Sequence, residues 1–321
     1  MTNALPAYNE LPALFAIELD NLGAITLSGE EQIKYLQGQV TCDVEDLKQQ
    51  KLLAGGHCNA KGKVFSVFRL IERQEKFFLI QASSSIADSL AELKKFGVFA
   101  KVDIAQDTEN AYLAIAGQNA AEKIAALFQV TPDSETPVVH DNGATIIYLA
   151  GKIARYLIID NSEKLTELVN TTAIPTFTQP VWDMMEIADG FPMLKAPYIA
   201  EYVPQMLNLQ AIKGISFTKG CYLGQETVAR MQYLGKNKRA LFALSGADSS
   251  AKVGDIIEKK LGENWRKAGD VLAAYHADNK QCYLQAVLAN DIDENTELRI
   301  KNQQQALTLM PLPYSLNTDL D

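Results

Sequence analysis

The feature that most limits the possible folds is a change in pattern near residue 238. Before it, apolar runs with strand character alternate with amphipathic helical stretches. After it, turn-rich segments separate six short strand candidates, at 240–244, 255–259, 269–275, 281–288, 298–300 and 306–310. Short strands at regular intervals with little helix are typical of a small antiparallel barrel. The sequence therefore predicts an α+β region over 1–237 and an antiparallel β-barrel domain over 238–321.

The region before residue 238 repeats one order of elements. Strand runs at 64–70 and 76–80 lead into a helix at 85–96, and a similar order of strands and helices continues to residue 169. We therefore expect two related α+β subdomains, although no residue-level repeat connects them. Near the start, strands are predicted at 16–19 and 24–27, on either side of a turn.

Composition excludes several classes of protein. The hydrophobic content of 47% is normal for a globular chain, and no run reaches the roughly 18 apolar residues of a membrane helix. Residues 1–19 lack a basic start and carry Glu10 and Glu18, which argues against a secretory signal. We expect a cytoplasmic monomer without membrane contact.

The cysteines and histidines give no metal-site pattern. No Cys-x-x-Cys pair occurs, and the histidines do not cluster. Neither a disulfide framework nor a metal site is expected. These residues are Cys42, Cys58, Cys221, Cys282, His57, His140 and His276.

The net charge of −9 disfavours nucleic-acid binding by the whole surface. The charge is unevenly distributed, however, because residues 213–239 hold six cations and the single acid Glu226. Either a local anionic ligand or an ordinary solvated helix face with a basic loop explains this basic island. Its cations are Lys213, Lys219, Arg230, Lys236, Lys238 and Arg239.

The segment 219–226 reads Lys-Gly-Cys-Tyr-Leu-Gly-Gln-Glu (KGCYLGQE). It combines glycines with a cysteine that precedes a predicted helix at 226–234. A thiol near a helix N-terminus and a lysine experiences positive potential, which favours the thiolate. Cys221, with Lys219 beside it, is therefore predicted to be a reactive thiol. The alternative is a small buried hydrophobe, which is the interpretation preferred for the other three cysteines.

Two further segments carry candidate binding residues. Residues 59–62 are predicted to form a tight hairpin turn, where Lys61 could face an anion such as a glutamate tail or simply be solvated. Trp182, Glu186 and Asp189 share one face of a predicted helix that Gly190 ends. A carboxylate beside a large aromatic side chain suits a flat heteroaromatic ring. The alternative is an interfacial tryptophan with surface acids.

Together these segments resemble the YgfZ family of folate-binding proteins, which is similar to the T-protein (aminomethyltransferase) of glycine cleavage. The family signature stands unbroken at 219–226, and 36–41, 61–63, 262–266 and 311–314 also match. The resemblance implies a ring of subdomains around a channel that holds tetrahydrofolate. It also implies a role in the assembly, maintenance or repair of iron–sulfur enzymes, including those that thiolate tRNA.

The resemblance also assigns residues to folate. One of the family's two folate-associated tryptophans matches Trp182, and the other falls near Leu22, where this chain lacks the indole. Glu186 and Lys61 are the further candidates for the folate site, and Cys221 and Lys219 are the candidates for chemistry.

The resemblance to T-protein does not extend to its catalytic acids. Ser66 and Val67 occupy the positions of the T-protein acidic pair, and neither can act as a carboxylate acid or base. A folate-binding maintenance factor is therefore favoured over a classical enzyme. The alternative is a one-carbon transferase with another acceptor, and direct tRNA binding is disfavoured by the net charge.

Overall fold

The computed structural model describes residues 4–235, 237–247 and 250–316. The α-helices are α1 (Gln32–Gln37), α2 (Leu47–Gln50), α3 (Ile86–Gly97), α4 (Ala120–Leu127), α5 (Ser162–Thr172), α6 (Gln179–Asp189) and α7 (Gln225–Tyr233). The strands are β1 (Phe15–Glu18), β2 (Leu22–Ser28), β3 (Leu52–Cys58), β4 (Val64–Arg73), β5 (Lys76–Ala82), β6 (Asp103–Gln106), β7 (Ala111–Ala116), β8 (Val138–Asp141), β9 (Ala144–Leu149), β10 (Arg155–Asp160), β11 (Thr176–Phe177), β12 (Arg239–Ala247), β13 (Ile256–Leu261), β14 (Asn264–His276), β15 (Gln281–Ala289), β16 (Leu298–Ile300) and β17 (Ala306–Met310).

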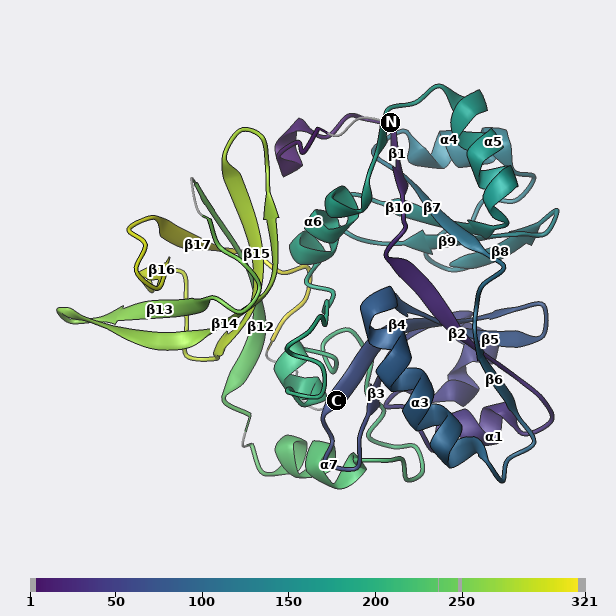
Figure 1. Ribbon diagram of the computed structural model, residues 1–321, viewed down its shortest axis with the longest axis horizontal. Coiled ribbons are helices and arrows are strands. Elements are labelled where there is room, and N and C mark those ends of the chain that lie inside the picture. The colour runs from purple at the N-terminus through teal and green to yellow at the C-terminus, as the bar shows by residue number, and fades with distance from the viewer. Residues whose placement is uncertain (1–3, 236, 248–249, 317–321) are drawn as a thin grey trace.

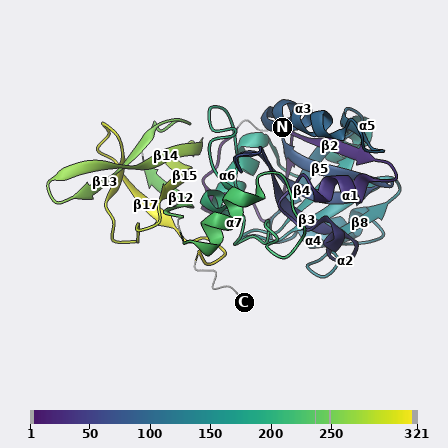
Figure 2. The ribbon, with the colours of Figure 1, turned by 90° about the horizontal axis from the view of Figure 1, so that it is seen from below.

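These strands form three units (Figure 1). A six-stranded sheet has the order β11-β1-β7-β10-β9-β8, and a five-stranded sheet has the order β3-β4-β5-β2-β6. The remaining strands close an antiparallel barrel in the order β12-β15-β14-β13-β16-β17. The predicted α+β fold with a C-terminal barrel is thus confirmed. Figure 2 shows the barrel at one end of the molecule and the two sheets at the other.

The first two strands are present as predicted, but they belong to different sheets. β1 lies between β7 and β11, whereas β2 lies between β5 and β6. The turn predicted between them is a crossing from one sheet to the other, and Leu22 already belongs to β2. The burial of their side chains explains this. Phe15 and Ile17 join the core shared with the barrel, while Ile25 and Leu27 join the core beneath α3.

Helix α6 lies at the junction of the three units and packs against β1, β14 and β15 (Figure 1). Almost every residue of α6 is buried, including Val181, Trp182 and Met185. A helix that is buried on all sides is held in place by the packing of its side chains against neighbouring elements. It ends as predicted at Gly190, whose φ of 66° suits a residue without a side chain.

An N-terminal strap, residues 4–11, extends from the sheets to the barrel (Figure 1). The amide of Leu5 donates to Asp278 Oδ2 at 2.8 Å, and the hydroxyl of Tyr275 donates to the carbonyl of Pro6 at 2.7 Å. The amide of Tyr8 also donates to the hydroxyl of Tyr283 at 3.0 Å. The strap therefore ties the first residues to β14 and β15 of the barrel. No helix in the described part of the chain is long and apolar enough to cross a membrane.

Candidate functional site

A cavity of about 230 Å³ lies beside α6, facing strands β2, β4 and β5. Its walls include aromatic, apolar and charged side chains. The main lining residues are Leu22, Val67, Arg69, Ile80, Gln81, Trp182, Asp183, Glu186, Phe191, Met193 and Lys195. The structure thus brings three of the predicted site residues, Trp182, Leu22 and Glu186, to one cavity.

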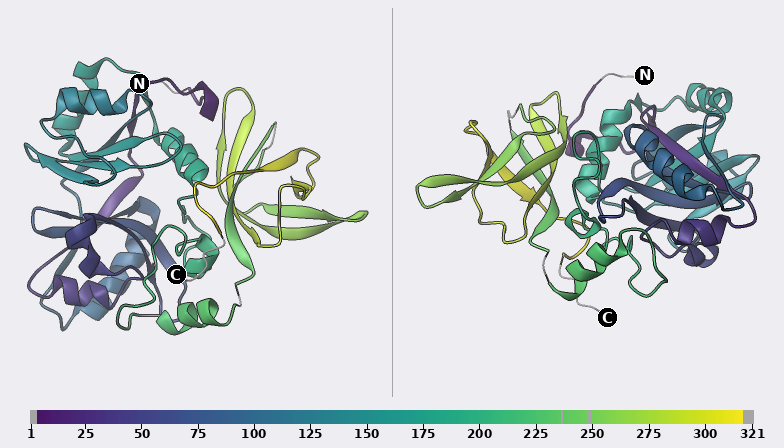
Figure 3. Two further views of the ribbon diagram at one scale, coloured as in Figure 1. Left: turned by 180° about the vertical axis from the view of Figure 1, so that it is seen from behind. Right: turned by 60° about the horizontal axis from the view of Figure 1, so that its bottom comes forward.

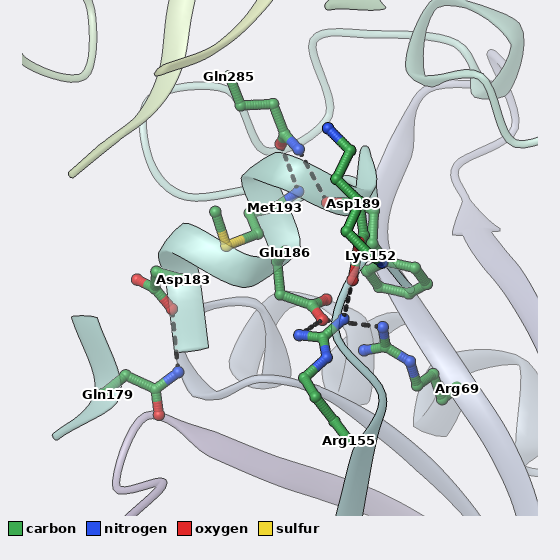
Figure 4. Close-up of polar contacts among 10 residues, drawn as sticks. Arg69, Lys152, Arg155, Gln179, Asp183, Glu186, Asp189, Met193 and Gln285 are labelled. Carbon is green, nitrogen blue, oxygen red and sulfur yellow. Dashed lines mark hydrogen bonds and ion pairs between the residues drawn. The ribbon is translucent and has the colours of Figure 1, made fainter. Parts of the chain in front are cut away.

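A buried network of ion pairs begins at two lining residues of this cavity, Arg69 and Glu186, and continues behind them to Arg155 and Asp189 (Figure 4). Glu186 Oε1 lies 3.0 Å from Arg69 Nη2 and 2.8 Å from Arg155 Nη1, and Arg155 Nη2 lies 2.6 Å from Asp189 Oδ2. Burial raises the pKa of Asp189, and the Arg155 guanidinium opposes that rise. Two cations and two carboxylates therefore balance one another, which is the arrangement in which buried charges are tolerated.

The two arginines also hold the aromatic rings. The guanidinium carbon of Arg155 lies 4.5 Å from the centre of the Trp182 ring, and that of Arg69 lies 3.6 Å from the centre of the Phe191 ring. Each ring is thereby fixed in orientation by a cation at one face. The alternative of surface acids is wrong, because Glu186 is only 2% exposed and Asp189 only 7%.

Gln81 differs from the other polar residues of the lining. It is 2% exposed, and neither its amide nitrogen nor its amide oxygen has a hydrogen-bond partner among the described residues. Gln285 shows the usual arrangement: its amide accepts from the backbone of Met193 and donates to the carbonyl of Phe191, both at 2.9 Å (Figure 4). A buried amide without partners is uncommon in folded proteins.

The motif loop, residues 219–226, lies elsewhere, next to α7 at the edge of the molecule away from α6 (Figures 1 and 3). Lys219 is buried, and its ammonium donates to the carbonyls of Gln37, Val40 and Cys42 at 2.6, 2.7 and 2.8 Å. Burial lowers the pKa of Lys219 to about 8, and the nearby Cys42 and Asp43 oppose the shift. Lys219 thus fastens the motif loop to residues 37–42.

Close packing against the β3–β4 hairpin explains two glycines. Gly62, in the predicted hairpin turn, has a positive φ of 71°, and a Cβ on it would lie 2.9 Å from Thr227 Cβ. Gly224 has a φ of 82°, and a Cβ there would clash with the carbonyl of Asn59. The turn that carries Lys61 therefore rests directly on the start of α7, and Lys61 itself is exposed.

Cys221 is the exposed cysteine of the four. Burial raises the pKa of both Cys42 and Cys58 to about 12, so these thiols stay protonated at neutral pH. Because the Lys219 ammonium is bound by carbonyls, the structure offers exposure as the physical basis for reactivity at Cys221. Neither Cys221, Lys219 nor Lys61 lines the cavity beside α6.

The basic island presents fewer exposed cations in the described structure than the sequence suggested. Lys219 points inward, and Lys236 lies outside the described residues. The island's exposed cations, among the residues that the structure describes, are Lys213, Arg230, Lys238 and Arg239. In the part of the chain that the structure describes, no group of three or more His, Cys, Asp or Glu side chains could hold a metal ion.

Sequence reasoning missed three lining residues of the cavity, Arg69, Gln81 and Lys195, and also Arg155, which pairs with Glu186 behind the lining. Arg69 and Gln81 stand within apolar strands, and Arg155 begins one. A single polar residue in such a run indicates a buried partner or ligand, since a buried charge is rarely left unpaired. Lys195, whose ammonium lies 2.8 Å from Asp183 Oδ2, had no comparable signal.

Comparison with known proteins agrees with this architecture. The family model described as "YgfZ, beta-barrel domain" matches residues 237–303. The aminomethyltransferase T of the glycine cleavage system from Bartonella henselae superposes with a TM-score of 0.72 at 13% identity, over 94% of this chain and 86% of that one. At that identity the similarity shows a shared fold.

Closer relatives match almost the whole chain. The tRNA-modifying protein YgfZ of Colwellia psychrerythraea is 56% identical over 97% of each chain. The protein of the same name from Yersinia enterocolitica is 41% identical, over 97% of this chain and 95% of its own. The chain therefore belongs to the YgfZ family.

Proposed function

We propose that this protein binds tetrahydrofolate in the cavity beside α6. The observation that carries the proposal is the convergence of Trp182, Leu22 and Glu186 on that cavity. An aromatic wall and a carboxylate suit the flat, nitrogen-rich pterin ring of a folate. The fold shared with an aminomethyltransferase adds support at the level of architecture.

Each of these residues has a distinct role in the proposed complex. Trp182 provides the aromatic wall, and Leu22 provides an apolar wall without stacking. Glu186 accepts hydrogen bonds from the N–H groups of the ring; its Oε2 takes part in neither of the contacts with Arg69 and Arg155. Lys195 lines the cavity and is 39% exposed at its side chain, so we assign the folate's carboxylate tail to Lys195 rather than to Lys61.

Classical aminomethyl transfer is not part of this proposal. Val67 lines the cavity, and Ser66 is fully buried with its hydroxyl 3.3 Å from that of Ser89. Neither side chain can supply the carboxylate that the T-protein reaction uses. The alternative function, one-carbon transfer to a different acceptor, would therefore need another acid or base.

In the cell, we infer a role in tRNA modification, the activity after which the relatives are named. We propose that the protein supports iron–sulfur enzymes, including those that thiolate tRNA, and that the exposed thiol of Cys221 makes the contact with a partner or its cluster. An exposed thiolate is the form of cysteine that reacts with thiols and metals.

Tryptophan fluorescence tests folate binding. The chain has two tryptophans, Trp182 in the cavity and Trp265 in the barrel, where Arg299 covers its ring. Titration with tetrahydrofolate should quench the emission of the wild type and of Trp265→Phe. Quenching should disappear in Trp182→Phe, which preserves an aromatic core residue. Equal quenching in both variants would remove Trp182 from the site.

Cellular tRNA tests the role of Cys221. Cys221→Ala should lower the level of thiolated nucleosides that depend on iron–sulfur enzymes, while Glu226→Gln, at an exposed site in the same loop, should leave it unchanged. In the purified protein, iodoacetamide should modify Cys221 before the three buried cysteines. Normal thiolation in Cys221→Ala cells would contradict the assigned pathway.

A further inference from the structure

One wall of the cavity beside α6 is a segment without regular secondary structure. Residues 191–195 follow the end of α6 and contribute five consecutive lining residues to the cavity. A segment outside helices and sheets lacks their regular hydrogen bonds between backbone groups. The position of this wall therefore depends on contacts with other parts of the chain.

Those contacts come from the barrel and from the segment that follows β17. The side chain of Gln285, in β15, accepts from the amide of Met193 and donates to the carbonyl of Phe191, both at 2.9 Å (Figure 4). The hydroxyl of Tyr314 donates to the carbonyl of Gly190 at 2.7 Å. All three distances are those of well-formed hydrogen bonds. These partners lie 92 to 124 positions further along the chain than the backbone groups that they hold.

The face of the barrel around Gln285 allows this close approach. Gln285 is fully buried, and its partners on the neighbouring strands are Ala243 of β12 and Ala273 of β14. Paired residues of antiparallel strands project from the same face, so two small side chains flank the carboxamide. Both alanines belong to the core cluster that contains Trp182. A buried carboxamide is costly unless it is bonded, and this one uses both of its groups on the cavity wall.

We propose that Gln285 and Tyr314 are positioning residues for the cavity, because they hold the backbone around Phe191 in place. The inference rests on the proposed function, and it makes the affinity for tetrahydrofolate depend on residues outside the cavity lining. The ring of Phe191 extends the effect, since the Arg69 guanidinium lies 3.6 Å from its centre and pairs with Glu186. A wall that is already in place does not have to be ordered when the ligand binds, which strengthens binding.

The direct test is Gln285→Met, which keeps the approximate shape of the side chain and removes both hydrogen bonds. In equilibrium titration, its affinity for tetrahydrofolate should fall about tenfold. In the unliganded protein, amide hydrogen exchange of residues 190–195, followed by mass spectrometry, should become faster, because the amide of Met193 loses its acceptor.

Leu284→Ala is the matched control. Leu284 is the preceding residue of β15 and is equally buried, but it belongs to the core of the barrel. Its truncation should lower the unfolding midpoint by leaving a cavity in the barrel. The affinity of this variant for tetrahydrofolate and the exchange of residues 190–195 should match those of the wild type.

A milder variant, Tyr314→Phe, tests the same wall and decides the question if Gln285→Met does not fold. It removes only the hydroxyl that binds the carbonyl of Gly190. That hydroxyl also accepts from Asn208 Nδ2 at 3.3 Å, but Asn208 keeps its bond to the carbonyl of Leu241 at 2.7 Å. The affinity for tetrahydrofolate should fall about threefold, with faster exchange of residues 190–195.

The outcomes separate this inference from the proposed function. Wild-type affinity in the folded Gln285→Met protein would overturn the inference and leave folate binding in place. A loss of affinity without faster exchange of residues 190–195 would do the same, and so would an equal loss of affinity in Leu284→Ala. Failure of the wild type to bind tetrahydrofolate would overturn the proposed function and this inference together.

Discussion

The cavity beside α6 and the motif loop differ in how their charged side chains are compensated. At the wall of the cavity and directly behind it, Arg69, Arg155, Glu186 and Asp189 are buried and neutralise one another. In the motif loop, one buried lysine is bound by neutral carbonyls, and the ion pair of Arg230 with Glu226 is exposed on α7. The charged groups at the cavity are therefore held in place by one another, whereas the motif loop is fastened by Lys219 and leaves Cys221 at the surface.

Breaking the buried ion pairs is expected to have the largest effect. Arg155→Met removes a partner of both Glu186 and Asp189 and leaves their charges poorly compensated in the interior. We expect the free energy of unfolding to fall by about 3–5 kcal/mol. Urea denaturation measures the change. A loss below about 1 kcal/mol would mean that the network is solvated and that the contrast with the motif loop is false.

Crowding the motif loop is expected to rank second. Gly224→Ala forces a side chain onto a left-handed backbone and into the carbonyl of Asn59, which should cost about 2–3 kcal/mol. Gly220→Ala is the matched control, because a Cβ at Gly220 has no atom within 4 Å. Urea denaturation of the pair should separate the glycine that is needed for packing from the one that is not; similar midpoints would contradict the close contact with the hairpin.

Lowering the pH is expected to have the third-largest effect on the free energy of unfolding, through His57 in strand β3. His57 is fully buried, its Nδ1 lies 2.8 Å from Ser89 Oγ, and burial lowers its pKa to about 4. In the unfolded chain the imidazole takes up a proton near pH 6.5, whereas in the folded protein it does so only near pH 4. Stability is therefore lost as the pH falls from about 6.5 to about 4. We expect a loss of about 2 kcal/mol from this group between pH 7 and pH 5.

A variant without the imidazole isolates this contribution. His57→Asn keeps a polar atom near the Nδ1 position and cannot take up a proton. Its free energy of unfolding should vary less between pH 7 and pH 5 than that of the wild type. Parallel pH profiles for the two proteins would show that another group controls the acid sensitivity.

The smallest effect is expected at the exposed pair of α7. Arg230→Met removes the contact with Glu226, in which both side chains are mostly exposed to solvent. Such pairs contribute little, so the free energy of unfolding should change by less than about 0.5 kcal/mol. Comparison with Arg155→Met shows how much more the buried ion pairs contribute than the exposed one. A large fall in the free energy of unfolding of Arg230→Met would show that ion pairs also stabilise the region of the motif loop and α7.

The barrel and the motif could be predicted because their signals are local. Turn residues between short strands indicate a barrel, and the glycines of the motif loop stand next to its cysteine in the sequence. The cavity is assembled from distant segments, since Arg69 and Glu186 are 117 residues apart. An arginine in an apolar strand indicates a buried partner but does not identify it. The crossing from β1 to β2 was missed for the same reason, because strand pairing depends on distant partners.

The N-terminal strap has a consequence for synthesis of the chain on the ribosome. Leu5 and Asp278, which bond to each other, are separated by 273 positions. The strap therefore has no partners until residues 275–283 have been synthesised, and β1 must likewise wait for β7 and β11. Docking of the strap is thus a late step of co-translational folding, which can occur only once β14 and β15 have left the ribosome.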